Sequence, residues 1–219
     1  METENGLPAK QRQLEKPMIL LATRNCHKTR EIREMLGEGV TVTDATERED
    51  LPEIEETGTT FAENARLKAE GISLRVGGIV LADDSGLEVD ALGGEPGVYS
   101  ARYAASAVAE GIVSAPSLDE ANTELVLKKM EGVPHAKRTA RFRCVLAVAS
   151  GGKTLALFDG SVEGFLATEV KGKGGFGYDP IFLPLGHTQS FGELPSGIKH
   201  DMSHRSRALA QFREWWAKA

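Results

Sequence analysis

The sequence of 219 residues lacks the features that mark several classes of protein. Its only two cysteines, Cys26 and Cys144, lie far apart and outside any CxxC or Cys/His cluster, which leaves neither a disulfide framework nor a zinc site. No apolar run approaches the roughly 18 residues of a membrane-spanning helix, and the polar residues 1–17 lack the apolar core of a secretory signal. We therefore expect no membrane partner, a reducing cytoplasmic setting, and a flexible tail over 1–17 ahead of one domain over 18–219.

Positive charge is also in short supply. The chain has 26 Lys and Arg against 32 Asp and Glu, a formal net charge of −6. Binding to nucleic acid normally needs a basic face, so we expect no nucleic-acid partner. A local cluster of cations can still bind an anionic small molecule, because the local field overrides the global sign.

Apolar residues recur with the spacing of an α/β domain. Short apolar runs at 18–22 and 79–82 predict buried strands, and helical spacing follows the first run at 29–36. The alanine-rich stretch 104–117 is expected to form a surface loop. Capping residues and hydrophobic periodicity predict further helices over 60–72, 117–132 and 203–217 and a long strand over 140–148.

One glycine-rich segment imitates a nucleotide-binding motif. The letters SGGKT at 150–154 resemble the end of a P-loop, G-x-x-x-x-G-K-[ST]. Ala147 stands where the first glycine is required, and strand patterns flank the segment on both sides. We therefore predict a hairpin turn at Gly151-Gly152 instead.

A first candidate site is the segment TRNCHK at 23–28, between a predicted strand and a predicted helix. Free backbone N–H groups at the start of a helix favour an anion. Thr23 and Asn25 can add hydrogen bonds, and Lys28 supplies a full positive charge to a phosphate. Two interpretations stay open here: a phosphate site, or a polar turn that caps a helix.

A second candidate is a group of acidic residues. Asp83 and Asp84 follow the predicted strand 79–82 directly, although two carboxylates in one site oppose each other's ionisation. Glu53, Glu55 and Glu56 precede the helix before that strand. Carboxylates at one end of neighbouring elements can hold Mg²⁺, while solvated loop acids remain the alternative for the three glutamates.

The third candidate combines a glycine-rich loop with a cationic segment. In KGGFGYDPIF at 173–182 the backbone can approach a planar ligand and an aromatic ring can stack on it, as a purine base would require. Asp179 or main-chain groups can fix the orientation of that base. Lys199, His204 and Arg205 follow, and His204 fits a general acid, a base-reading residue or a helix-start residue.

In this order, the motifs resemble the inosine triphosphate pyrophosphatase family. The resemblance runs from about Met18 to the C-terminus. It rests on T-x-N-x-x-K at 23–28, E-E-T-G at 55–58, T-F-x-E-N-A at 60–65, A-D-D-S-G-L at 82–87, L-G-G-x-P-G-V-Y-S-A-R-Y at 92–103, G-G-F-G-Y-D-P-I-F at 174–182 and S-H-R-x-x-A at 203–208.

The resemblance implies an α/β fold in which helices surround a long curved mixed β-sheet and two lobes form a substrate cleft. It implies a homodimer that hydrolyses deaminated purine nucleoside triphosphates (dITP, ITP, XTP) to the monophosphate and pyrophosphate with Mg²⁺. Such an enzyme removes these compounds from the nucleotide pool. Two rivals stay open: a pyrophosphatase for another abnormal nucleotide, such as a modified pyrimidine triphosphate, and a nucleotide-binding regulator without turnover.

Matched residue by residue, the resemblance also implies roles. Asp84 is expected to bind Mg²⁺ with Glu55 or Glu56 and to act as the base for the attacking water, and Lys28 to offset charge on the departing pyrophosphate. The resemblance implies that Thr23, Asn25 and Lys28 bind the triphosphate, that Ser85 contacts substrate, and that the base is framed by Phe176, Gly177, Tyr178, Asp179, Lys199, His204 and Arg205. Arg24, Cys26 and His27 of the same loop are also expected to bind substrate.

Two features depart from the family pattern. The family usually has glycine where this chain has Arg24 and His27, and these side chains can either tighten phosphate binding or crowd the loop. The stretch 104–117 is longer than usual, at a lobe edge or a dimer contact. The separate role of Asp83 stays open.

Overall fold

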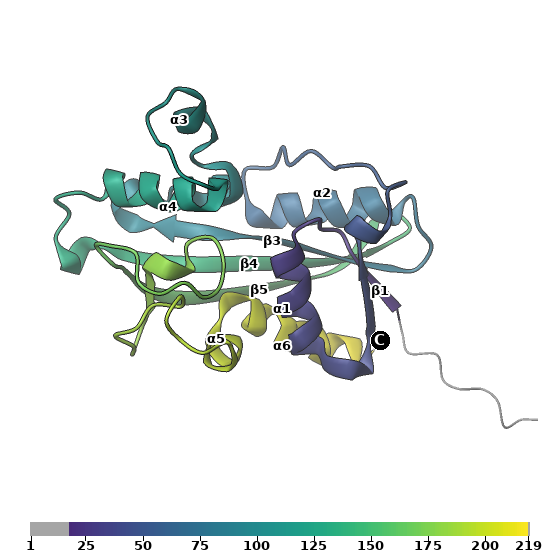
Figure 1. The fold of residues 1–219 in the computed structure, drawn as a ribbon. Helices are drawn as coiled ribbons and strands as arrows, with labels where there is room; N and C mark the ends of the chain where they lie inside the picture. The colour runs from purple at the N-terminus through teal and green to yellow at the C-terminus, as the bar shows by residue number, and fades with distance from the viewer. Residues whose placement is uncertain (1–17, 219) are drawn as a thin grey trace, which may run out of the picture.

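A six-stranded mixed sheet forms the centre of the computed structural model, which describes residues 18–218 (Figure 1). The tail predicted over 1–17 lies outside the described residues. The strand order is β2-β1-β3-β4-β5-β6. The first three strands in sequence pair in parallel: β1 (Met18–Leu21), β2 (Thr41–Asp44) and β3 (Ile79–Val89). The others add antiparallel: β4 (Thr139–Ser150), β5 (Lys153–Leu166) and β6 (Phe182–Pro184). The expected mixed α/β sheet is confirmed.

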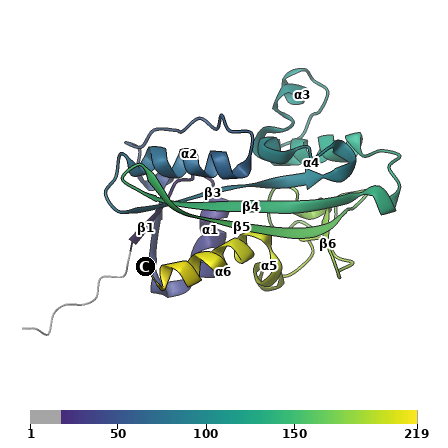
Figure 2. The ribbon, with the colours of Figure 1, turned by 180° about the vertical axis from the view of Figure 1, so that it is seen from behind.

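Helices cover both faces of this sheet (Figures 1 and 2). One face carries α2 (Phe61–Ser73) and α4 (Leu118–Lys129), with the short α3 (Ala105–Ala109) projecting beyond α4. The other face carries α1 (Cys26–Leu36), α5 (Ser196–Met202) and α6 (His204–Trp216). Short 3₁₀ helices occupy Gly37–Gly39, Ala45–Glu47, Asp90–Leu92, Gly97–Arg102, His135–Lys137 and Asp179–Ile181.

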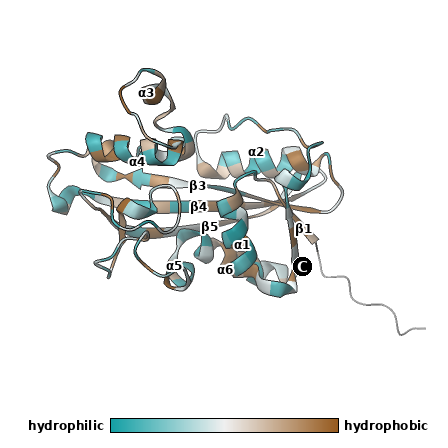
Figure 3. Cartoon of the chain, in the orientation of Figure 1, coloured by the Kyte–Doolittle hydropathy of each residue, from teal (hydrophilic) through white to brown (hydrophobic). Residues whose placement is uncertain are grey.

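Successive side chains of a strand point to opposite faces, so each face of the sheet has its own core. Val80 and Ala82 of β3 pack in the cluster that contains Phe61 of α2, whereas Leu81 packs in the cluster that contains Phe212 of α6. A further cluster around Phe142 fills the other end of the long strands. Hydrophobic residues accordingly concentrate in the strands, and the helices carry both kinds of residue (Figure 3). Within residues 18–218, no helix is long and apolar enough to cross a membrane.

The strand predicted over 79–82 is longer than expected. β3 continues to Val89 because β4 pairs with it along its whole length, with Asp83 opposite Leu146 and Asp84 opposite Val145. The expectation that the two aspartates follow the end of a strand is therefore wrong. They lie inside it, and their side chains point to opposite faces of the sheet.

The other predicted elements agree with the structure, apart from two boundaries. α1 begins at Cys26 rather than at 29, because the Asn25 side chain accepts hydrogen bonds from the amides of His27 and Lys28 and so caps the helix. The expected loop 104–117 contains α3. The hairpin turn at Gly151-Gly152 is confirmed, with both glycines at positive φ between β4 and β5. The strand 140–148 and the helices 60–72, 117–132 and 203–217 correspond to β4, α2, α4 and α6.

The position of α6 depends on Gly160 of β5. A Cβ atom added there would collide with the carbonyl oxygen of His204 and would lie 2.7 Å from the amide nitrogen of Ala208. The missing side chain lets the first turns of α6 lie directly on the sheet, which places His204 and Arg205 beside β3 and β4.

We therefore expect Gly160→Ala to lower the free energy of unfolding by about 1–3 kcal/mol, the usual cost of overpacking a core. Urea unfolding followed by circular dichroism measures this difference. Gly77→Ala is the control, because a Cβ there meets nothing within 4 Å. Equal midpoints for the two variants would contradict a tight contact between α6 and β5.

Candidate active site

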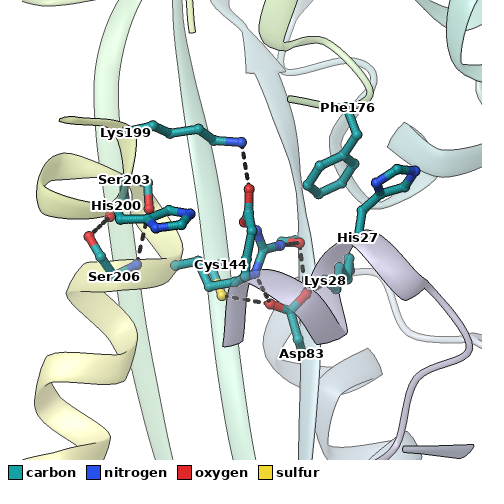
Figure 4. A network of polar contacts seen from close by, with 12 residues as sticks. His27, Lys28, Asp83, Cys144, Phe176, Lys199, His200, Ser203 and Ser206 are labelled. Atoms are coloured by element: carbon teal, nitrogen blue, oxygen red, sulfur yellow. Dashed lines mark hydrogen bonds and ion pairs between the residues drawn. The ribbon is translucent and has the colours of Figure 1, made fainter. Parts of the chain in front are cut away.

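Asp83 is the centre of a buried set of ion pairs on the face of the sheet that carries α1 and α6 (Figure 4). Its Oδ1 lies 2.6 Å from Nζ of Lys28, and its Oδ2 lies 2.8 Å from Nε of Arg205. The Ser85 hydroxyl donates to Oδ1 at 2.8 Å. Burial alone would raise the pKa of this carboxyl, but the charges of Arg205 and Lys28 outweigh burial and hold the pKa well below its usual range. Asp83 is therefore ionised at neutral pH.

The same set continues toward the glycine-rich loop. Glu31 of α1 accepts from Lys199 at 2.7 Å and also pairs with Arg205. Lys199 lies 2.6 Å from Oδ2 of Asp179. We call Lys28, Glu31, Asp83, Asp179, Lys199 and Arg205 the buried charge cluster. Its three cations balance its three anions, which is the condition under which buried charges can persist.

Asp84 points to the opposite face, toward α2. Its Oδ1 lies 2.7 Å from Nζ of Lys68, which also lies 2.8 Å from Oε1 of Glu56. The other oxygen, Oδ2, is buried and has no hydrogen-bond partner. Burial raises the pKa of Asp84 and outweighs the opposing effects of Lys68 and Lys28. Asp84 is thus the more basic of the two neighbouring aspartates, and one of its oxygens is still free.

Lys68 itself stays charged. Burial would lower its pKa, but the carboxylates of Asp84 and Glu56 raise it above the usual value. The pKa of Glu56 is lowered, since Lys68 outweighs the effect of burial, and Arg102 Nη1 lies 3.0 Å from its other oxygen. On the face of the sheet that α2 covers, one cation, Lys68, therefore lies between two carboxylates.

His204 begins α6 and is buried, with its ring stacked on Phe142 at a centroid distance of 4.9 Å. Burial lowers its pKa well below the usual value, and the nearby charges of Arg205 and Lys199 lower it further. The ring is therefore neutral at physiological pH, and its buried Nδ1 has no partner. Such a ring can form a hydrogen bond to a ligand without carrying a charge.

Two hollows meet at these residues. A cavity of about 80 Å³ is lined by Ser85, Phe176, Lys199, His204 and Arg205, among others. A neighbouring groove of about 240 Å³ is lined by Thr23, Glu56 and Lys68, among others. Asn25 and Lys28 line both. The arrangement is a cleft with a cationic, partly aromatic end and an end of mixed charge.

Some predicted site residues have other partners. Arg24 donates to the carbonyl oxygens of Ala45 and Leu51, and it also lines the 240 Å³ groove. Tyr178 is buried and donates to the carbonyl oxygen of Ser100. Glu55 is exposed and lines neither hollow, whereas Glu56 contacts Lys68.

The remaining predicted residues divide by position. Cys26 is exposed at the start of α1, and Gly177 lies next to Phe176 on the cavity wall. The carboxylate of Asp179 accepts from the Phe176 amide at 2.8 Å, and burial raises its pKa against the effect of Lys199. The ring of His27 stacks on that of Phe176.

Sequence reasoning missed Lys68 and Glu31. Lys68 is a charged residue on the apolar face of α2, three residues after Ala65 and four before Ile72. Glu31 lies one helical turn after Lys28 and beside the buried Ile32. A charge on the buried face of an amphipathic helix was the available signal in both places.

Comparison with known proteins identifies the family of the chain. Residues 19–215 match the model of the Ham1 family. The chain belongs to the Ham1 family. A Ham1-family relative from Oceanobacillus iheyensis, named dITP/XTP pyrophosphatase, is 46% identical over 201 residues, which are 90% of this chain and 96% of that protein. A protein of the same name from Bacillus licheniformis is 48% identical over 195 residues, covering 89% and 95% of the two chains. The expected family is confirmed.

Solved Ham1 structures share the fold. The Ham1 protein of Staphylococcus aureus superimposes with a TM-score of 0.77 at 36% identity, over 92% of this chain and 98% of that one. A HAM1 protein from Coxiella burnetii gives a TM-score of 0.79 at 37% identity, over 93% and 100% of the two chains. The cleft described above therefore lies within a fold that the Ham1 family shares.

The buried charge cluster predicts the behaviour of Asp83→Asn. Loss of this carboxylate leaves Arg205 and Lys28 without their common partner, so we expect the free energy of unfolding at pH 7 to fall by about 3–5 kcal/mol. Urea unfolding measures it, with Asp201→Asn, an exposed aspartate, as the matched control.

The pH dependence of this difference gives a second readout. The folded-state pKa of Asp83 lies below its unfolded value, so its contribution to stability is complete above about pH 4 and disappears as the pH falls through the folded-state pKa. The difference in the free energy of unfolding between wild type and Asp83→Asn should therefore become smaller at acidic pH. A gap that stays constant below pH 4 would show that the ionised form is not the source of the stability.

Proposed function

We propose that this protein is a Mg²⁺-dependent nucleoside-triphosphate pyrophosphatase that converts dITP, ITP or XTP and water to the nucleoside monophosphate and pyrophosphate. The names of the Ham1 relatives support the reaction. From the family resemblance we also propose a cytoplasmic homodimer that has no nucleic-acid or membrane partner. The observation that carries the proposal is the buried Oδ2 of Asp84, which has no hydrogen-bond partner. Asp84 itself lines neither hollow, but its Oδ1 contacts Lys68 on the wall of the groove.

The donors around Asp84 suit a hard divalent cation. Mg²⁺ binds through one or two carboxylates together with substrate phosphates and water, and Asp84 and Glu56 both contact Lys68 at the groove. Within residues 18–218 no group of three or more His, Cys, Asp or Glu gathers for a metal. Substrate phosphates and water would supply the remaining ligands. When bound, Mg²⁺ polarises phosphate oxygens and offsets their charge. The free Oδ2 makes Asp84 the better of the two carboxylates for this position.

Asp84 also suits the task of a general base. Its raised pKa makes its carboxylate a stronger proton acceptor than that of an exposed aspartate. Lys28 and Lys68, which both line the groove, supply positive charge where the departing pyrophosphate becomes more negative. Thr23 and Asn25 lie beside Lys28 and complete the phosphate end of the cleft.

The other end of the cleft suits a 6-oxopurine. Lys199 and Arg205 can only donate hydrogen bonds, and they line the cavity together with the neutral ring of His204. A purine O6 accepts from such groups. The 6-amino group of adenine would instead leave buried donors without partners, which rejects a substrate more strongly than lost contact area does.

A panel of nucleoside triphosphates assayed for pyrophosphate release with Mg²⁺ tests the substrate class. We expect kcat/KM for dITP, ITP and XTP to exceed that for ATP by at least two orders of magnitude, and chelation of the metal to abolish release until Mg²⁺ is restored. Preference for a modified pyrimidine triphosphate would point to the rival substrate class, and no release from any triphosphate would favour a binding protein without turnover.

Replacement of Asp84 tests the proposed catalytic role. Asp84→Asn keeps the size of the side chain but removes the proton acceptor and the charged metal ligand. We therefore expect kcat for dITP to fall by about 10²–10⁴-fold. The unfolding midpoint should change far less than in Asp83→Asn, because Asp84 contacts a single cation at the edge of the groove. Asp90→Asn, on an exposed aspartate of the same strand region, is the control. Near-normal turnover in Asp84→Asn would rule out this assignment.

A further inference from the structure

His27 stacks face to face on Phe176. The two ring centroids are 5.2 Å apart and the ring planes are within 10° of parallel. His27 lies in the first turn of α1, and Phe176 lies in the glycine-rich loop. The Nη2 atom of Arg30 lies 3.1 Å from Nδ1 of His27, which fixes the rotation of the imidazole. The stack therefore joins the phosphate end of the cleft to the loop at its other end.

The opposite face of the Phe176 ring is turned toward the cavity. Nζ of Lys199 lies 5.1 Å and Cζ of Arg205 lies 5.8 Å from the ring centroid, and all three residues line the 80 Å³ cavity. Figure 4 shows the ring between Lys199 and His27. A planar base in this cavity would have Phe176 as an aromatic wall, with His27 behind that wall.

Hydrogen bonds fix the backbone of Phe176, but the residues adjacent to it in the sequence do not fix its ring. Its amide donates to Asp179, and the amide of Gly177 donates to Asp119 of α4 at 3.1 Å. The adjacent residues are Gly175 and Gly177, both at positive φ, which have no side chains to support the ring. Orientation of the ring therefore depends on what lies against its two faces.

Behind the stack there is room for the ring to move. A groove of about 740 Å³, bounded by α4 and residues 170–177, is lined by both His27 and Phe176. Without the imidazole, the phenyl ring can rotate into this groove and leave the cavity without its wall. With the imidazole in place, the ring is already ordered in the free protein, so ligand binding loses no conformational entropy in ordering it.

We infer that His27 is a positioning residue that holds the Phe176 ring as a stacking wall for the nucleobase, and that it does not bind the phosphates. The inference rests on the proposed function for the identity of the base. It makes His27 a determinant of base affinity through Phe176, at a loop position where the family usually has glycine.

The test compares His27→Ala with His27→Phe. We expect His27→Ala to raise KM for dITP about two- to tenfold, the range that corresponds to one aromatic pair, and to leave kcat within about twofold. His27→Phe keeps a ring on Phe176 and should restore KM. The inhibition constant of inorganic tripolyphosphate, which has no base, should be the same in all three proteins. His135→Ala is the matched control, because it removes a stack of similar geometry on Phe165, 5.4 Å between centroids, outside the cleft.

Several results would overturn the inference. A weaker inhibition by tripolyphosphate in both variants would place His27 on the phosphates, and an unchanged KM in His27→Ala would show that the ring needs no support. A lower KM for dITP in His27→Ala would mean that the stack blocks the cavity and hinders binding of the base. Failure of His27→Phe to restore KM, with its unfolding midpoint unchanged, would exclude stacking as the cause.

Binding of inosine monophosphate, followed by calorimetry, separates this inference from the proposed function. It requires no turnover, so it tests the stack even if the wild type releases no pyrophosphate from dITP, a result that would count against the proposed function alone. We expect the dissociation constant to rise about two- to tenfold in His27→Ala and to return in His27→Phe. Equal constants in all three proteins would overturn the role of His27.

Discussion

The ion pairs of Asp83 are the constraint on which the rest of the site depends. A carboxylate in the interior of a sheet is costly unless cations meet it, and here Lys28 arrives from α1 and Arg205 from α6. Each of these cations also belongs to the cleft. The ion pairs that stabilise the Asp83 carboxylate inside β3 therefore also fix the positions of α1 and α6. The phosphate loop precedes α1, and α6 contributes to the wall of the base cavity.

The alternation of a β-strand explains how two adjacent aspartates can have different tasks. Asp83 faces α1 and α6, where two cations keep it ionised, and Asp84 faces α2, where burial raises its pKa and one oxygen stays free. Each carboxylate has its own lysine, Lys28 on one face and Lys68 on the other. The repulsion expected of neighbouring acids is relieved because the sheet separates them, with no need for a metal shared by both.

The sequence predicted much of this fold but little of the pairing at its centre. Periodicity and capping residues indicated α2, α4, β4 and α6, because those signals are local. The extension of β3 through Asp83 and Asp84 could not be read locally, since it results from pairing with β4 more than fifty residues later. Lys68 and Glu31 were missed for a similar reason: a charge on an apolar helix face becomes meaningful only when its counter-charge is known. The chain contacts of Arg24 with the Ala45 and Leu51 carbonyls and of His27 with Phe176 were likewise not visible in the sequence, because their partners are distant along the chain.

The buried charge cluster also dictates an order of assembly. Arg205 lies 122 residues from Asp83 along the chain and 174 from Glu31, and Lys199 lies 168 from Glu31. Within the buried charge cluster, Glu31 and Asp83 have only Lys28 to neutralise them until α5 and α6 have been made. Closing such long loops is slow and entropically expensive. This face of the sheet can therefore acquire its full set of counter-charges only when α5 and α6 pack on it.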